Sequence, residues 1–456
     1  MTKTTTRHQM DMTHGSLWDK LIIFAIPLAL TSILQLLFNS ADTAVVGHFA
    51  SSEAQAAVGA NNSVISLLVN TFVGMSVGAN VLVAKFIGQE KQDAIEAAVH
   101  TAVALAFIIS AGVVVIGELA AKPILTLMGT PDNVITLAVL YLRIYLIGVP
   151  FEMLYNFGAA ILRSQGDSRR PLYSLMFSGV VNVILNLFFV ILMHMSVAGV
   201  AVATVIANGV AAGLVLSFLM TEPAPFTLQL TKLRIHGGCL KQIIAIGAPA
   251  GFQSSLFSIS NICVQSSVNS FGSLAMAGNS IAQYFDLFAY FFTGGFSQAC
   301  VTFTSQNSAA GREDRCARVF WLSLSFGMLV TLTMSSTFYL GRGFFLGLYS
   351  ANATVLGFAA TRMLHCGMFQ FLEGLFDIPG SSLRGHGHSL IPAVLTVIGT
   401  CGYRLGWIFL VFPGTRDYGR LMNVYPISWI LTGIMMLIAY ARMKRSLRTA
   451  PMPRIA

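Results

Sequence analysis

Charged residues are scarce in this sequence. Asp, Glu, Lys and Arg make up 10% of the 456 residues, whereas hydrophobic residues make up 55% and the mean hydropathy is +0.73. About a quarter of the residues of a soluble domain are charged, so a large water-soluble helical protein is disfavoured. Alternating ten-residue strands, the pattern of a transmembrane barrel, are not seen either. These absences indicate a protein whose helices lie in a lipid bilayer.

The sequence also has few cysteines and no recognisable catalytic motif. The chain has 6 cysteines with neither a CxxC pair nor zinc-ligand spacing, so no disulfide or metal framework is predicted. His365, His386 and His388 are isolated or fall in joints, and we do not expect them to bind a metal. No HExxH, GxSxG or comparable constellation is present, so an enzyme is not expected.

Long apolar stretches are abundant instead. A bilayer core is spanned by roughly 20 apolar residues in a helix, and such stretches recur on both sides of a polar interval. We predict an all-α integral membrane protein with twelve transmembrane helices in two parallel six-helix repeats. Its amino-terminal lobe is residues 1–220, its cytosolic linker 221–238 and its carboxyl-terminal lobe 239–456. The predicted spans are 21–38, 64–84, 97–116, 134–153, 172–193, 197–220, 243–264, 281–301, 319–340, 355–370, 391–412 and 427–440.

The basic residues are unevenly distributed around these spans. The first 20 residues lack a cleavable signal pattern, so we expect the amino terminus to be cytosolic. Basic residues then gather in the two tails, including Lys3, Arg7 and Arg454, and in the cytosolic joints. The outside joints hold only Lys122, Arg342, Arg416 and Arg420. By the positive-inside rule, this predicts a cytoplasmic-membrane protein with both termini cytosolic. The net charge of +9 therefore reflects orientation and contact with anionic lipid, and nucleic acid is not an expected partner.

Two similar segments reveal an internal repeat. L-R-S-Q-G-D-S-R-R-P begins at Leu162 and L-R-G-H-G-H-S-L-I-P begins at Leu383. In each joint we expect the Gly to end one helix, and Ser168 or Ser389 to cap the next. We interpret this motif as architectural.

The repeat extends over nearly the whole of both halves. Glu152 matches Glu373, and the joint G-Q-E-K-Q-D from Gly88 matches G-R-E-D-R-C from Gly311. With six spans each, the halves enter and leave on the same side, so they are parallel repeats about an axis along the membrane normal. Two such bundles enclose a cleft that rocking exposes to either side in turn. This organisation favours a transporter.

Asp42 is the clearest functional candidate. A carboxyl group inside a bilayer is costly and is a functional candidate by default. Gln35 and Asn39 lie on the same helix face, because they precede Asp42 at helical spacing. Such an acid can bind H⁺ or Na⁺ and release it when it meets water.

Further polar residues fall in other spans. Asn182, Asn186 and Thr204 form stripes that can contribute to a site, or can simply join helices by hydrogen bonds. Glu373 and Asp377 lie at positions i and i+4, which predicts a cation or proton site, and Asp286 is another buried acid. Arg143 and Arg362 can pair with acids or extend toward the interface.

Several motifs resemble those of the multidrug and toxic compound extrusion (MATE) family. These are P-L-A-L from Pro27, D-T-A-V-V-G from Asp42, I-L-R-S-Q-G-D-S from Ile161 and L-R-G-H-G from Leu383. The resemblance implies a prokaryotic cation-coupled antiporter that uses H⁺ or Na⁺ and no cofactor. It would export amphipathic, often cationic, organic compounds by alternating access between two lobes. We expect small organic molecules and membrane lipids as partners, and a monomer.

The resemblance also implies site residues. The pattern is nearer to DinF-like relatives, with Asn186 where an aspartate is usual, which puts a two-acid proton relay in doubt. Glu373 matches an acid of NorM-like relatives, whose seventh-helix glutamate has no counterpart here. The predicted ion-coupling residues are Asp42 and Glu373. The predicted cavity residues are Gln35, Asn39, Tyr141, Asn156, Asn182, Asn186, Thr204 and Asp377. A flippase for a lipid-linked saccharide, or a membrane receptor without transport, stays open as an alternative.

Overall fold

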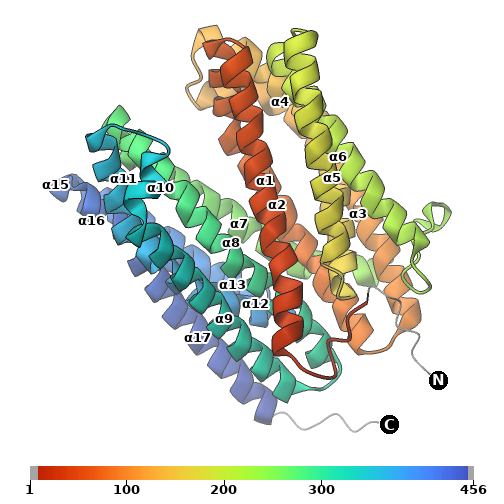
Figure 1. Cartoon of the computed structure of the whole chain (residues 1–456). Coiled ribbons are helices and arrows are strands. Elements are labelled where there is room, and N and C mark those ends of the chain that lie inside the picture. Colours follow the sequence, from red (N-terminus) through yellow and green to blue (C-terminus); the bar gives the residue numbers. More distant parts are fainter. Residues whose placement is uncertain (1–8, 450–456) are drawn as a thin grey trace. The chain divides into compact units, whose positions relative to one another are not determined.

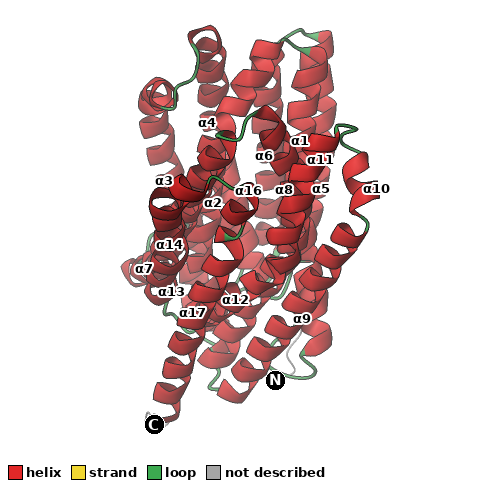
Figure 2. Cartoon of the chain, turned by 90° about the vertical axis from the view of Figure 1, so that its left-hand side faces the viewer, coloured by secondary structure: helices red, strands yellow, loops and turns green. Residues whose placement is uncertain are grey.

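The protein is all-helical. The computed structural model describes residues 9–449, in which helices are joined by short loops and no strand occurs (Figure 2). The predicted basic residues Lys3, Arg7 and Arg454 lie outside the described residues. The α-helices of the first part of the chain are α1 (Trp18–Phe49), α2 (Ser52–Gly88), α3 (Gln92–Leu127), α4 (Asp132–Ser164), α5 (Arg169–Leu187) and α6 (Ser196–Thr221). Those that follow are α7 (Gly237–Asn269), α8 (Ser273–Ala309), α9 (Glu313–Leu340), α10 (Arg342–Gly347), α11 (Ala353–His365), α12 (Gly374–Gly385), α13 (Leu390–Thr396), α14 (Tyr403–Gly406), α15 (Phe412–Thr415), α16 (Tyr418–Met422) and α17 (Val424–Thr449).

Short π and 3-10 segments interrupt this series. The π segments are η1 (Phe188–Leu192), η4 (Val397–Gly402) and η5 (Trp407–Val411), and the 3-10 segments are η2 (Leu230–Lys232) and η3 (Gly367–Glu373). A π segment follows α5 directly, and two more lie between α13 and α15. The helix after the L-R-x-x-G joint is therefore locally widened in both halves, as expected for a duplicated element.

Ten helical segments within residues 9–449 are long and apolar enough to cross a membrane. They correspond to ten of the twelve predicted spans. The other two are α8, which has 37 residues but is more polar, and the interrupted segment α11–η3–α12. Large apolar side chains such as Leu127 and Leu410 are 88% and 83% exposed, which suits contact with lipid tails. The prediction of an all-α, multi-pass membrane protein is confirmed.

The predicted span 355–370 is not one continuous helix, and that expectation was wrong. α11 ends at His365, and a 3-10 segment from Gly367 to Glu373 leads into α12. At Gly367 a Cβ atom would lie 2.8 Å from Oδ1 of Asp286 in α8. The backbone is thus drawn close to a buried carboxylate, which only glycine permits. The break therefore lies where the chain passes close to another helix, which the apolar pattern does not reveal.

The chain folds as two compact units. Unit 1 comprises residues up to Asp11 and Leu30–Gly251, and unit 2 comprises Met12–Ala29 and the chain from Phe252 onward. The division falls inside α1 and inside α7, close to the prolines that these helices contain, Pro27 and Pro249. Each proline removes one backbone hydrogen bond and provides a site of bending.

Helix α4 has its main contacts with three other helices of unit 1. It packs against α2, α3 and α6, and α5 packs on α6, beside which it lies in Figure 1. The end of α4 is almost completely buried from Met153 to Ser164. At Gly74 and Gly78 of α2 the backbone of α7 is so close that an added Cβ would clash with it. Small residues permit such close helix packing in membranes.

Helix α8 has the corresponding place in unit 2. It packs against α9, α11 and α12, and α12 packs on α17. At Gly278 a Cβ would lie 2.5 Å from the carbonyl oxygen of Val355 at the start of α11. Unit 2 also contains the first part of α1, where Phe24 meets Phe303 of α8 with ring centroids 5.7 Å apart.

The repeated joint has the expected helix ends but a different cap. α4 ends at Ser164 and α12 at Gly385, and Gly166 and Gly387 follow with positive φ angles of 93° and 88°. Neither Ser168 nor Ser389 caps the next helix through its side chain, so that expectation was wrong. In the first half Asp167 takes this role, because its Oδ1 accepts hydrogen bonds from the backbone N–H groups of Arg169 and Arg170.

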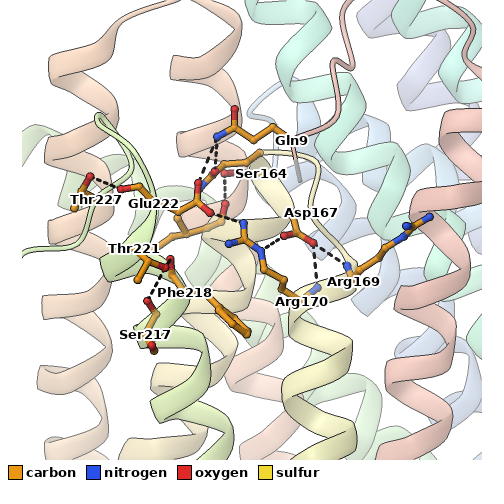
Figure 3. Close-up of polar contacts among 12 residues, drawn as sticks. Gln9, Ser164, Asp167, Arg169, Arg170, Ser217, Phe218, Thr221, Glu222 and Thr227 are labelled. Atoms are coloured by element: carbon orange, nitrogen blue, oxygen red, sulfur yellow. Dashed lines mark hydrogen bonds and ion pairs between the residues drawn. The ribbon is translucent and has the colours of Figure 1, made fainter. Parts of the chain in front are cut away.

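Arg170 ties this first joint to the end of α6 (Figure 3). Its guanidinium pairs with Asp167 and with Glu222, and lies 5.5 Å from the ring centroid of Phe218. The Nε2 group of Gln9 donates to Glu222 at 3.4 Å and to Gln165 at 3.1 Å. This polar network is the physical basis of the joint's architectural role in unit 1.

Candidate functional site

Asp42 lies in α1 inside unit 1, where its carboxylate contacts one residue of α5 and one of α6. Its side chain is buried, with 6% of the residue exposed. Asn186 of α5 donates through Nδ2 to Oδ1 of Asp42, and Thr204 of α6 donates through Oγ1 to Oδ2 at 3.2 Å. The structure therefore brings together residues from three helices that the sequence suggested separately.

The two asparagines of α5 complete this cluster. Asn186 donates to Oδ1 of Asn182 at 3.1 Å, and Asn182 donates to Oγ1 of Thr204 at 3.3 Å. We call Asp42, Asn182, Asn186 and Thr204 the Asp42 cluster. The one-turn spacing of Asn182 and Asn186 puts both amides on the same face of α5, so both reach the carboxylate's surroundings.

The Asp42 cluster holds a negative charge without a basic partner. Within residues 9–449, no Lys, Arg or His side chain forms an ion pair with Asp42. Its contacts are neutral donors, and Oδ1 of Asn186 is buried without a hydrogen-bond partner. A desolvated carboxylate needs a compensating positive charge. Carboxylate, amide and hydroxyl oxygens are ligands for hard cations, so the cluster can take up a proton or a small metal cation.

The other predicted cavity residues of unit 1 lie outside this cluster. Asn39 is exposed and Gln35 half-buried, and neither shares a hydrogen bond with Asp42 in the described structure. Tyr141 is buried, and its ring stacks on Tyr145 with centroids 6.5 Å apart. Asn156 is buried and donates to the backbone oxygen of Glu152 at 3.0 Å, a bond within α4.

Unit 2 has acids of a different kind, because arginines accompany them. Asp286 of α8 and Arg362 of α11 form an ion pair at 2.8 Å, with side chains only 6% and 5% exposed. Arg362 also donates to Oδ1 of Asn279 at 2.9 Å, and its guanidinium lies 5.1 Å from the ring centroid of Tyr425. The sequence allowed Arg362 either to pair with an acid or to extend toward the interface, and the structure shows that it pairs with an acid. Arg143 pairs with Glu118 at 3.4 Å, at an exposed position.

Glu373 and Asp377 lie where the interrupted segment becomes α12. Glu373 is the residue before α12 and has helical backbone angles, so the i, i+4 spacing to Asp377 is kept. Glu373 is buried and accepts a hydrogen bond from Gln370. Asp377 repels Glu373 and Arg404 attracts it, and Arg384 attracts Asp377. Both acids thus have a cation near them, which Asp42 lacks.

Arg404 is a notable residue that the sequence interpretation did not use. It is completely buried, and donates to Asn261 at 2.7 Å and to Ser428 at 3.1 Å. Its guanidinium lies 4.6 Å from the ring centroid of Tyr425, and its Nη2 has no hydrogen-bond partner among the described residues. An arginine within a predicted span was the signal that could have identified it.

Glu152 is a second residue of this kind. Its carboxylate accepts a hydrogen bond from the hydroxyl of Tyr145 at 3.1 Å. In the sequence Glu152 was noted only as the repeat partner of Glu373. The two tyrosines and this acid form a second polar group in unit 1, on α4 alone.

Comparison with known families identifies the repeated halves. The MatE family model matches residues 27–188 and 249–408, one segment in each half of the repeat. Together these segments cover more than half of the chain. The match agrees with the prediction of a transporter rather than an enzyme.

Curated relatives match over most of their length. The chain is 27% identical over 413 residues to the probable multidrug resistance protein YoeA of Bacillus subtilis (strain 168), covering 88% of each protein. It is 24% identical over 397 residues to the probable multidrug resistance protein NorM of Thermotoga maritima, covering 86% of this chain and 85% of that protein.

Solved structures share the fold. A MOP superfamily transporter from Pyrococcus furiosus superposes with a TM-score of 0.89 at 18% identity, covering 98% of this chain and 100% of that chain. An outward-facing MATE family transporter superposes with a TM-score of 0.88 at 19% identity and the same coverage. At this identity the likeness shows the fold alone.

Proposed function

We propose, from the premise that this chain belongs to the MatE family, that it is a cation-coupled antiporter exporting amphipathic organic compounds. The single observation that carries the coupling is Asp42, a buried carboxylate among neutral donors with no basic partner. The relatives described as probable multidrug resistance proteins support drugs as the exported class. The acid set is nearer to the DinF-like pattern.

The Asp42 cluster binds the coupling ion, H⁺ or Na⁺. In the ion-free state, N–H and O–H donors of Asn186 and Thr204 stabilise the carboxylate. When a cation binds, these donors are no longer needed. The amide of Asn186 can then turn its oxygen, now without a partner, toward the bound ion or the protonated acid. Asn186 thus serves both states of the site by rotation of one amide group.

One carboxylate sets the charge that the cluster can carry. Asn186 is an amide and takes up no proton near neutral pH, so only Asp42 among the four side chains becomes charged. A single monovalent cation neutralises it. We therefore propose a stoichiometry of one ion for each cycle at this cluster.

Glu373 is less suited to ion coupling than Asp42. Asp377 repels the Glu373 carboxylate and Arg404 attracts it, while Arg384 attracts Asp377. The two acids therefore stand beside two arginines, so a further cation is needed less there than at Asp42, which has no basic partner. We propose that Glu373 and Asp377 shape the interior of unit 2 and that Asp42 carries the principal coupling.

The cycle uses the two units as the moving lobes. We propose that external cation binds Asp42 in an outward-open state and loosens drug binding, and that return to the inward-open state releases the cation. The duplicated helix order supports two equivalent lobes, and the basic joints support cytosolic termini in the cytoplasmic membrane. Bending of α1 at Pro27 and of α7 at Pro249 gives each helix a place to adapt.

The test is transport of a fluorescent cationic dye in proteoliposomes, with Na⁺ and pH gradients imposed separately. We expect flux under one of these gradients for the wild type and none above background for Asp42→Asn. Glu118→Gln is the matched control, because it neutralises an acid of unit 1 that pairs with Arg143 at an exposed position. Gradient-driven flux in Asp42→Asn equal to that of the wild type would refute the coupling role.

The same vesicles separate the alternatives. A flippase would move a lipid-linked saccharide between leaflets and show no gradient-driven dye flux. A receptor would bind dye without moving it under any gradient.

A further inference from the structure

Three potential metal ligands meet where α9 begins. Glu313 and Cys316 lie in the first turn of α9, and His386 lies in the loop between α12 and α13. A carboxylate oxygen, the thiol sulfur and an imidazole nitrogen of these residues all lie within 4.8 Å of one another. His386 is 73 residues from Glu313 in the chain, so the sequence did not indicate this group. All three belong to unit 2.

The contacts of His386 cannot all be satisfied by a neutral imidazole. Its Nδ1 lies 2.8 Å from the carbonyl oxygen of Ser382, and its Nε2 lies 3.1 Å from Oε2 of Glu313. A carbonyl oxygen and a carboxylate can only accept, whereas a neutral imidazole carries one N–H. With the proton on Nδ1, two lone pairs face each other between His386 and Glu313. That gap requires either a second proton on the ring or a cation between the two side chains.

The geometry around this gap suits a metal ion. A metal-bound histidine normally donates its other ring N–H to a carboxylate or a backbone carbonyl, the contact that Ser382 provides. Zinc bonds of about 2.0–2.1 Å to nitrogen and oxygen place two tetrahedral ligands roughly 3.3 Å apart. The 3.1 Å separation of Glu313 and His386 is close to this value. The hydroxyl of Ser308 donates to the other carboxylate oxygen of Glu313 at 2.8 Å and orients it.

Cys316 supplies the ligand that determines the class of metal. It is buried, and its thiol has only a long contact of 3.7 Å to the carbonyl oxygen of Thr304. A zinc–sulfur bond of about 2.3 Å would place the sulfur roughly 3.5 Å from the other ligands, so it must move about 1 Å inward. Thiolate with imidazole and carboxylate selects zinc-like ions over Mg²⁺ or Ca²⁺, which prefer oxygen ligands.

A cavity of about 280 Å³ lies against the three side chains. Tyr440 and Lys444 of α17 and Asp314 of α9 also line it. It holds space for water at a fourth coordination position and provides a path for an ion to enter. By the sequence-based topology, this end of α9 faces the cytosol.

The first half of the repeat provides an internal comparison. The matching joints place Glu90, Asp93 and Gln165 where Glu313, Cys316 and His386 stand. Gln165 there accepts a hydrogen bond from Gln9 instead. The imidazole and the thiol occur only in the second half, so the duplicated fold does not by itself require them.

We propose that Glu313, Cys316 and His386 bind one zinc-like divalent ion, with water as the fourth ligand. The ion ties the start of α9 to the loop that follows α12. Because it bridges two joints of unit 2, it stabilises that end of the unit by binding the folded state alone. This site is independent of the transport function.

The test uses the full-length chain without a histidine tag, in nanodiscs after treatment with a chelator. Zn²⁺ is titrated against a fluorescent competitor, and Co²⁺ replaces it for absorption spectroscopy. We expect one ion per chain, a thiolate-to-Co²⁺ charge-transfer band, and a rise in melting temperature on Zn²⁺ addition.

Two ligand variants are compared with two controls. Cys316→Ser removes the charge-transfer band, and His386→Gln installs the residue of the first half. Each weakens Zn²⁺ binding by more than the roughly 10–100-fold typical of losing an outer-shell partner. His388→Gln alters an exposed neighbour, and Cys263→Ser alters a cysteine of α7, so both should bind like the wild type.

The proposal fails if the wild type gives no charge-transfer band. It also fails if both ligand variants bind Zn²⁺ as the wild type does. Glu313 and His386 would then form an ion pair with a protonated imidazole. Size-exclusion profiles and unmetallated melting temperatures identify a variant that has misfolded, and the remaining ligand variant then decides the outcome.

Discussion

The same substitution, Asp to Asn, should have opposite consequences at two buried positions. Asp42 and Asp286 are each 6% exposed, so both carboxylates are removed from water to a similar degree. They differ in their partners, because Asp286 pairs with Arg362 and Asp42 has only neutral donors. We predict that Asp286→Asn destabilises the protein and that Asp42→Asn stops transport without destabilising it.

The cost at Asp286 follows from the arginine that remains. Arg362 is 5% exposed at its side chain and would keep its contact with Asn279 but lose its counter-charge. Removing one partner of a buried pair typically costs about 3–5 kcal/mol, because the other charge stays buried and uncompensated. The contact with Tyr425 is present with or without the Asp286 carboxylate, so it does not change this cost. We expect a loss of about 3–5 kcal/mol in the free energy of unfolding.

The balance at Asp42 is different. Two hydrogen bonds to a charged group are worth about 1.5–3 kcal/mol each. The Asn amide has one acceptor oxygen, which keeps the bond from Asn186, and its N–H group can donate to Oγ1 of Thr204, whose own proton bonds to the carbonyl oxygen of Val200. These neutral bonds are worth about 0.5–1.5 kcal/mol each, so about 2–3 kcal/mol is lost. Removing an unpaired buried charge returns a desolvation penalty of several kcal/mol. We expect the free energy of unfolding to stay within about 1 kcal/mol of wild type, or to rise.

The assay is reversible unfolding in mixed micelles, paired with dye transport in proteoliposomes for the same preparations. The double variant Asp286→Asn/Arg362→Gln should recover much of the stability lost in Asp286→Asn, since it removes the stranded charge. If Asp42→Asn lost as much stability as Asp286→Asn, Asp42 would be a structural acid, and the reasoning from charge partners would be wrong.

Three further predictions concern other residues. Glu373→Gln should keep at least about half of the ion-driven dye flux, because Glu373 and Asp377 have Arg404 and Arg384 beside them, whereas Asp42 has no basic partner; complete loss would move the coupling to unit 2. Asn186→Asp adds a second acid beside Asp42, and like charges a hydrogen bond apart cannot both ionise, so one acid stays protonated, the pair still takes up one cation, and the steepness of transport against cation concentration should stay that of the wild type; a steeper dependence would contradict the one-ion stoichiometry. Arg170→Met should lower the free energy of unfolding by about 3–5 kcal/mol, because the carboxylates of Asp167 and Glu222 stay buried without it, whereas the exposed Arg169→Met should change it by less than about 0.5 kcal/mol.

Much of the architecture was readable from local patterns. Apolar stretches of bilayer length predict helices wherever they occur, since backbone hydrogen bonds in lipid must be satisfied within the segment. The repeat of the L-R-x-x-G joint was likewise visible, and α4 and α12 end at equivalent positions. The interruption between α11 and α12 was not visible, because it lies where Gly367 approaches Asp286 of another helix.

The candidate site was likewise predictable only in part. Asp42, Asn182, Asn186 and Thr204 were candidates by residue type and helical spacing, and the structure brings them into hydrogen-bond contact. Gln35 and Asn39 shared the predicted face of Asp42 but form no hydrogen bond with it in the described chain. Spacing along one helix defines a face, whereas the neighbours that face meets depend on how other helices pack.

Composition and local patterns are enough to show that this protein lies in a membrane, is helical and duplicated, and carries acids that a membrane makes costly. Which of these acids have a cationic partner depends on the folded chain, because such pairs form between residues far apart in the sequence. Arg362 meets Asp286 across 76 residues, and His386 meets Glu313 across 73. Asp42 meets no cation at all among the described side chains. Charge in a low-dielectric interior is governed by its nearest partners, and those partners are set by packing.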